Sequence, residues 1–95
     1  MSQFVLYCRD KADSVALRME TREKHLAYLA DVEVLLAGPM LNEADEPVGS
    51  VVIVEAPDLQ AAKAIAENDP YAKAGLFESV EVSAYRAVLG TLAPA

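Results

Sequence analysis

Residues 49–70, Gly-Ser-Val-Val-Ile-Val-Glu-Ala-Pro-Asp-Leu-Gln-Ala-Ala-Lys-Ala-Ile-Ala-Glu-Asn-Asp-Pro, join one strand pattern directly to one helix pattern. Gly49-Ser50 introduces the run Val51 to Glu55, whose β-branched residues predict a strand. The next three residues, Ala-Pro-Asp, mark the start of a helix, and Asp58 is the expected N-cap. This stretch therefore predicts a strand followed closely by a helix.

The predicted second helix has a narrow apolar face of small residues that suits close packing on a sheet. The residues of this face are Leu59, Ala62, Ile65 and Ala66. Pro70 disfavours helical conformation at the preceding residue, so the helix should end at Asp69. The carboxylate of Asp69 would then lie at a helix-to-loop corner. An acid at a helix C-terminus is disfavoured by roughly 0.3–1 kcal/mol, which a nearby cation such as His25 or Arg22 would offset.

The N-terminal part of the chain shows the same strand-to-helix order. Phe4 to Cys8 is a short apolar run that predicts the first strand. Residues 14–31 predict a helix with Asp13 or Ser14 as its N-cap, because no Pro or Gly interrupts the chain before Gly38. The apolar face expected for this helix comprises Val15, Met19, Leu26 and Leu29.

Two apolar runs separated by an acidic segment predict a hairpin. Val32 to Ala37 reads as the second strand, closed by Gly38-Pro39. Residues 40–48 carry three acids and should form an exposed connection before the third strand, Val51 to Glu55. We therefore expect a hairpin with a long loop.

Tyr71 to Gly75 is expected to be irregular or a single turn, and Phe77 to Val88 alternates as a half-buried last strand. Thr91 to Ala95 should be a frayed tail. The order strand-helix-strand-strand-helix-strand predicts an α+β, ferredoxin-like βαββαβ domain over residues 1–95. Its four-stranded antiparallel sheet would carry two helices on one face. The other face would need a cover, most simply a second copy of the chain.

Composition excludes several classes of partner. The chain has 95 residues, with 8 Lys+Arg against 15 Asp+Glu and a net charge of -7, which argues against nucleic acid and against anionic membrane surfaces. No secretory signal and no apolar run of about 20 residues is evident, so a cytoplasmic location is expected. The single cysteine, Cys8, falls in a predicted strand and is expected to be a core residue rather than a nucleophile.

A polar stripe on the first predicted helix reverses this acidic character locally. Arg18, Arg22 and His25 are four and three residues apart and should share one face, at the edge of the apolar face. The helix offers neither arginine an acid four residues away, which favours a tertiary or ligand partner, although solvation at the surface is the commoner fate for Arg18. The stripe suggests a pocket for a small anion or polarised substrate.

Several of these motifs, in this order, resemble the YCII-related (YciI-like) family over about Phe4 to Val88. The matching features are Tyr7 with Arg9-Asp10-Lys11, Arg22-x-x-His25-Leu26, Gly38-Pro39, Gly49-Ser50, and Asp69-Pro70-Tyr71 followed by Gly75. The resemblance implies a dimeric α+β barrel, in which two ferredoxin-like sheets pack face to face. The wider superfamily includes cofactor-free enzymes that act on small cyclic or aromatic compounds, such as muconolactone isomerase. The resemblance also implies a His–Asp pair, which here would be His25 and Asp69.

His25 is the natural proton carrier of the chain, and a carboxylate such as Asp69 would fix its tautomer and stabilise the imidazolium. The plain alternatives are a buried, inert histidine and an aspartate that bonds only to local backbone. Arg22 is expected to hold the negative oxygen of a substrate. Further expected substrate contacts, each with a purely structural alternative, are Ser50, Tyr7 and Tyr71. No metal motif, phosphate-binding glycine loop or nucleophile elbow is visible, so neither a metal nor a cofactor is expected.

The leading hypothesis from the sequence is a homodimeric enzyme that performs cofactor-independent proton transfer, of the isomerase or lyase type, on a small cyclic or phenolic anion. The alternative is a non-catalytic module that binds a small molecule with the same dimeric fold. A third class, a purely structural subunit, predicts no pocket beside His25.

Overall fold

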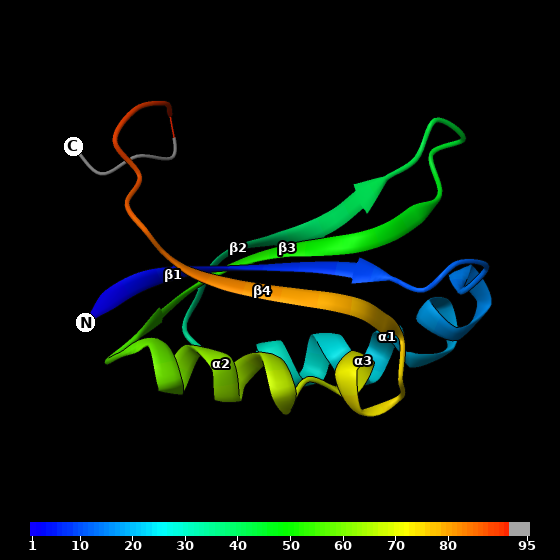
Figure 1. Ribbon diagram of the computed structural model, residues 1–95, viewed down its shortest axis with the longest axis horizontal. Helices are drawn as coiled ribbons and strands as arrows, with labels where there is room; N and C mark the ends of the chain where they lie inside the picture. The colour runs from blue at the N-terminus through cyan, green and yellow to red at the C-terminus, as the bar shows by residue number, and fades with distance from the viewer. Residues whose placement is uncertain (92–95) are drawn as a thin grey trace.

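The computed structural model describes residues 1–91 and contains one four-stranded antiparallel sheet in the order β2-β3-β1-β4. The elements in chain order are β1 (Ser2–Asp10), α1 (Val15–Leu29), β2 (Val34–Leu41), β3 (Pro47–Ala56), α2 (Leu59–Glu67), α3 (Pro70–Lys73) and β4 (Phe77–Tyr85). All three helices lie on one side of the sheet, and no described element covers the other side (Figure 1). The predicted α+β, ferredoxin-like arrangement is confirmed.

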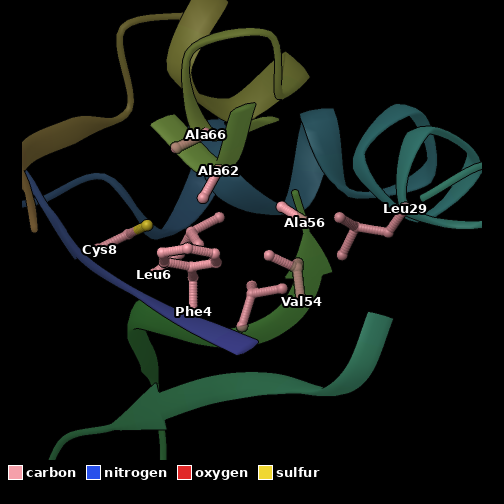
Figure 2. Close-up of a cluster of buried hydrophobic side chains, with 9 residues drawn as sticks. Phe4, Leu6, Cys8, Leu29, Val54, Ala56, Ala62 and Ala66 are labelled. Carbon is pink, nitrogen blue, oxygen red and sulfur yellow. The ribbon is translucent and has the colours of Figure 1, made fainter. Parts of the chain in front are cut away.

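The core lies between the sheet and α2. Alternate residues of β1, namely Phe4, Leu6 and Cys8, point toward the helices and are buried. They meet Val54 of β3 and the small residues Ala62 and Ala66 of α2 (Figure 2). Because alanine has a short side chain, α2 can approach the sheet closely, as its apolar face predicts. Cys8 is a core residue, as expected.

The β2–β3 hairpin is longer in its strands and shorter in its loop than the sequence predicts. β2 runs through Gly38-Pro39, which were expected to end it. β2 is an edge strand, and an edge strand tolerates a proline because one side of it has no hydrogen-bonding neighbour. The loop shrinks to a turn over residues 42–46, in which the Asn42 side-chain oxygen accepts hydrogen bonds from the amides of Ala44 and Glu46. The expectation of a long loop was therefore wrong.

Gly49 is the point where β3 passes closest to its neighbours. A Cβ atom at this position would lie 2.5 Å from the carbonyl oxygen of Cys8 and 2.3 Å from the Cε of Met40. Only a residue without a side chain fits there, because β1 contributes backbone rather than a flexible side chain to the contact.

The buried face of α1 differs from the expected apolar face. The buried residues are Arg18, Thr21, His25 and Leu29, which follow helical spacing, whereas Met19 and Leu26 are 56% and 46% exposed. The helix has therefore turned Arg18 and His25 of its polar stripe inward, which the apolar pattern alone did not predict, while Arg22 stays exposed. The physical reason is that the polar groups of this stripe find tertiary partners, as described below.

The second half of the chain also departs from the prediction at Asp69. α2 is capped by Asp58, whose side chain accepts a hydrogen bond from the amide of Ala61, as expected. α2 ends at Glu67, however, and Asp69 is the N-cap of α3 with Pro70 directly after it. A carboxylate is favoured at a helix N-terminus, so the electrostatic misfit expected for Asp69 does not arise.

β4 ends at Tyr85 rather than Val88, which is 78% exposed beyond the sheet. The predicted frayed tail falls mostly on residues 92–95, outside the described residues. No helix among residues 1–91 is long and apolar enough to cross a bilayer.

Candidate functional site

The structure brings His25 and Asp69 together across the gap between α1 and α3. The Nδ1 atom of His25 lies 2.9 Å from Oδ1 and 2.8 Å from Oδ2 of Asp69, and both residues are buried. A carboxylate accepts a hydrogen bond, so Nδ1 carries the proton in this pair. Nε2 of the neutral imidazole is then a free base, and no protein group within residues 1–91 bonds to it.

Asp69 is itself held in place by backbone. Its Oδ1 atom accepts a hydrogen bond of 2.9 Å from the amide of Tyr71, which closes the first turn of α3. The Asp-Pro-Tyr sequence therefore fixes the acid through local geometry, and α1 brings the histidine to it. The local bond and the tertiary pair, which the sequence presented as alternatives, occur together.

The ring of Tyr71 lies against both His25 and Arg18. It stacks on the imidazole with centroids 4.0 Å apart and planes 17° apart, and the Cζ of Arg18 lies 4.6 Å from its centroid. Arg18 and His25 are seven residues apart on α1, a rise of about 10.5 Å, so the tyrosine ring fits between them. Tyr71 is only 1% exposed.

Arg18 forms a buried ion pair with Asp10 beside the His25–Asp69 pair. Its Nε and one terminal nitrogen bond to the two carboxylate oxygens of Asp10 at 2.7 and 3.1 Å. The same terminal nitrogen donates to the Oγ of Ser50 at 2.7 Å. This bidentate geometry is strong and directional, and it explains why α1 can bury an arginine. The expectation that Arg18 is solvated at the surface is therefore wrong.

A cavity of about 440 Å³ lies between α1 and the β2–β3 hairpin and is bordered by His25. Its polar lining residues are Arg18, Arg22, His25, Ser50 and Tyr71. Its apolar lining residues are Met19, Leu26, Leu29, Ala37, Pro39, Leu41, Pro47 and Val52. The purely structural alternative predicted no pocket beside His25, and this prediction was wrong.

Not every expected substrate contact lies in this cavity. Arg22 borders it with an exposed side chain, and Ser50 and Tyr71 border it from the buried end. Tyr7 lies on the alternate side of β1 from the core residues, where its hydroxyl accepts a hydrogen bond of 2.8 Å from Arg9. The structure therefore corrects the expectation that Tyr7 lines the pocket.

Burial shifts two nearby titratable groups. Desolvation raises the pKa of the Tyr71 phenol, and the guanidinium groups of Arg18 and Arg22 partly oppose this rise. Desolvation, with the negative charge of Asp69, raises the pKa of the Cys8 thiol from 9.0 to about 12. Both groups are therefore neutral at physiological pH. A neutral Cys8 thiol is a poor nucleophile, which agrees with its place in the core.

The sequence prediction missed the roles of two residues of the site: Asp10, which appeared only in the family motif and was given no role, and Arg18, which was not expected to be buried. The available signal was spacing, because Arg18 lies two helical turns before His25 and must share its face. Within the part of the chain that the structure describes, no three His, Cys, Asp or Glu side chains gather to hold a metal ion.

Comparison with known proteins relates the chain to one family. Protein YciI of Escherichia coli O6:H1 (strain CFT073) is 40% identical over an alignment 95 residues long, which covers 90% of this chain and 97% of that protein. The solved structure of 5-chloro-2-hydroxyhydroquinone dehydrochlorinase (TftG) from Burkholderia phenoliruptrix AC1100, in complex with 2,5-dihydroxybenzoquinone, matches with a TM-score of 0.83 and 30% identity. The match covers 90% of this chain and 95% of that one.

An antibiotic biosynthesis monooxygenase, at 17% identity and a TM-score of 0.56, covers 94% of this chain and 100% of that one and shares the fold. The family model of the YCII-related domain matches residues 2–86 of this chain. The chain therefore belongs to the YCII-related family.

Proposed function

We propose that this protein is a cofactor-independent enzyme that transfers a proton on a small cyclic or phenolic anion, in an isomerase- or lyase-type reaction. The observation that carries the proposal is the buried His25, whose Nδ1 is held by Asp69 while its ring borders the cavity. A free Nε2 atom beside a cavity is the geometry that a general base requires.

In this mechanism the Nε2 atom of His25 removes a proton from an acidic O–H or C–H bond of the substrate. Asp69 stabilises the imidazolium that forms, as the orienting acid does in a catalytic triad. Negative charge develops on a substrate oxygen, and the guanidinium groups of Arg18 and Arg22 border the same cavity and would stabilise it. The imidazolium then returns the proton to another atom or to a leaving group.

The lining of the cavity and the similarity to TftG support this substrate class. The cavity combines the guanidinium groups of Arg18 and Arg22 with apolar walls, which suits a flat ring that carries a negative oxygen. TftG is named as a dehydrochlorinase of a chlorinated hydroxyhydroquinone, and it is 30% identical to this chain. Hydroxylated quinones and phenols are therefore the first compounds to assay.

The open face of the sheet supports a homodimer. Val5, Val51 and Ile53 lie on the side of the sheet away from the helices and are only partly buried in the single chain. A second copy packed on this face would remove these apolar side chains from water.

The test is turnover of hydroxylated quinones and phenols by the native protein, His25→Ala and Asp69→Asn. We expect a drop of about 10²–10⁴-fold in kcat for His25→Ala and loss of the acidic limb of the pH–rate profile, because that limb reports protonation of the general base. Unchanged turnover in both variants would overturn the proposal. Calorimetric binding of these compounds without any product would instead favour the non-catalytic binding module.

A further inference from the structure

The polarity of the cavity runs opposite to that of an ordinary protein surface. The residues at its deep end are polar and buried, with exposed fractions of 4% for Arg18, 7% for His25 and 3% for Ser50. At its mouth the large apolar side chains are exposed, with fractions of 56% for Met19, 46% for Leu26 and 54% for Leu41, and the exposed Arg22 is the one charged residue among them. Single exposed apolar residues are common, but these three line one cavity.

The walls between the two ends are apolar as well. Leu29 and Val52 line the cavity from α1 and β3, and Pro39 lines it from β2. A single six-membered ring held at the buried polar end would leave much of the 440 Å³ volume, and the whole mouth, without a partner. The residues of the mouth do not pack into the core of their own chain, so the fold alone does not require them to be apolar.

We infer that the natural ligand is an amphiphile that enters head first, with an anionic ring at the buried polar end and an apolar substituent along the walls to the mouth. This inference rests on the proposed function, and it adds the apolar substituent to the substrate class. Removal of the substituent from water would be the main source of affinity, whereas the polar end would orient the ring.

The expected size of this effect follows from hydrophobic transfer. Each methylene group buried on the walls should tighten binding about fourfold. The gain should stop once the substituent passes Met19 and Leu41 and reaches water. A ladder of chain lengths therefore measures both the affinity per methylene and the depth of the cavity.

The experiment uses calorimetry of the native protein with 2,5-dihydroxybenzoquinone and with its 3-ethyl, 3-butyl and 3-hexyl derivatives. We expect Kd to fall about fourfold per methylene over the first part of the series. Binding of the parent ring with no dependence on chain length would overturn the inference and leave the proposed function intact. Failure of every member of the series to bind would overturn both.

A matched pair of variants locates the effect. Leu41→Ser removes an apolar side chain from the mouth, whereas Leu35→Ser removes one of similar exposure (49%) from the same strand outside the cavity. We expect Leu41→Ser to weaken binding of the butyl compound about 5- to 10-fold and leave the parent ring unaffected, and Leu35→Ser to change neither. Equal effects of the two variants would contradict the inference. A change in sedimentation coefficient for Leu41→Ser would also overturn it, by assigning the mouth to contact between copies.

Discussion

The imidazole of His25 and the phenol ring of Tyr71 are stacked, with centroids 4.0 Å apart and planes 17° apart. The amide of the same Tyr71 donates to Asp69, the partner of His25. One residue thus restrains both members of the pair, the imidazole through its ring and the carboxylate through its backbone. This arrangement restricts the imidazole to a single orientation with Nε2 free.

Asp69 has a local structural role and a tertiary role that two substitutions can separate. Asn retains a side-chain oxygen that accepts from the amide of Tyr71, whereas Ala does not. We expect Asp69→Ala to be less stable than Asp69→Asn by about 1 kcal/mol, the value of an N-cap, while both lose most turnover. Urea unfolding and kcat of the two variants check this, and equal free energies of unfolding would contradict the capping role.

Replacing only one member of the Asp10–Arg18 ion pair should strongly lower the free energy of unfolding. Arg18→Met leaves the carboxylate of Asp10 buried without its cation, and we expect a loss of about 3–5 kcal/mol in the free energy of unfolding. Adding Asp10→Asn should restore a large part of this loss, because the uncompensated charge is gone. Denaturant titrations of the two single variants and the double variant measure the coupling. A loss below about 1 kcal/mol for Arg18→Met would show that the pair behaves like a solvated surface pair.

The contributions of the Tyr71 ring and of its hydroxyl can be separated by substitution. Within residues 1–91 the hydroxyl bonds to no protein group, and Tyr71 borders the cavity. We expect Tyr71→Phe to retain the stack and the stability but weaken ligand binding about 5- to 10-fold, the value of one hydrogen bond. Tyr71→Leu, the control, should also destabilise the fold. Calorimetry and thermal unfolding distinguish these effects, and unchanged affinity in Tyr71→Phe would remove the hydroxyl from the site.

The raised pKa of the Cys8 thiol predicts how the free energy of unfolding changes at alkaline pH. Above the ordinary thiol pKa of 9.0 the unfolded chain loses a proton that the folded chain keeps up to about 12. Unfolding then releases a proton, so stability falls as pH rises through this window. We expect the native protein to lose about 1 kcal/mol more than Cys8→Ala between pH 8 and pH 10, measured by urea unfolding. Parallel pH curves for the two proteins would contradict the raised thiol pKa.

The open sheet face makes a prediction about assembly. Ile53→Glu places a charge in the middle of that face, and we expect it to weaken self-association at least 10-fold without unfolding the chain, because Ile53 is only partly buried. Leu59→Glu, at an exposed position on α2, is the control. Sedimentation velocity measures both. A native protein that sediments as a monomer at every concentration would rule out the dimer.

The parts of the fold that the sequence predicted correctly are those where local signals agree with the tertiary arrangement. The strand and N-cap signals around Val51 to Asp58 were confirmed because local propensity and packing favour the same structure there. The predicted apolar face of α2 was confirmed for Ala62 and Ala66 but was wrong for Leu59, which is exposed. The prediction of the hairpin was less accurate. A Gly-Pro pair such as Gly38-Pro39 would end a central strand, but β2 is an edge strand and continues through it. Edge position is a property of the whole sheet and is not encoded in the residues themselves.

The site was only partly predictable for a related reason. Spacing put Arg18 and His25 on one face of a helix, but it did not show that this face is buried. Burial of Arg18 depends on Asp10, Ser50 and Tyr71, which come from three other parts of the chain. A hydropathy pattern treats such an arginine as a surface residue, since it cannot include partners that only the folded chain supplies.

A substitution at Gly49 would disturb both the sheet and the polar end of the cavity. It precedes Ser50 and lies so close to the carbonyl of Cys8 that any side chain would push β3 away from β1. That displacement would carry the serine hydroxyl away from the guanidinium of Arg18, although position 49 does not line the cavity. Among sequences selected for activity, this position should therefore tolerate fewer replacements than many residues that line the cavity itself.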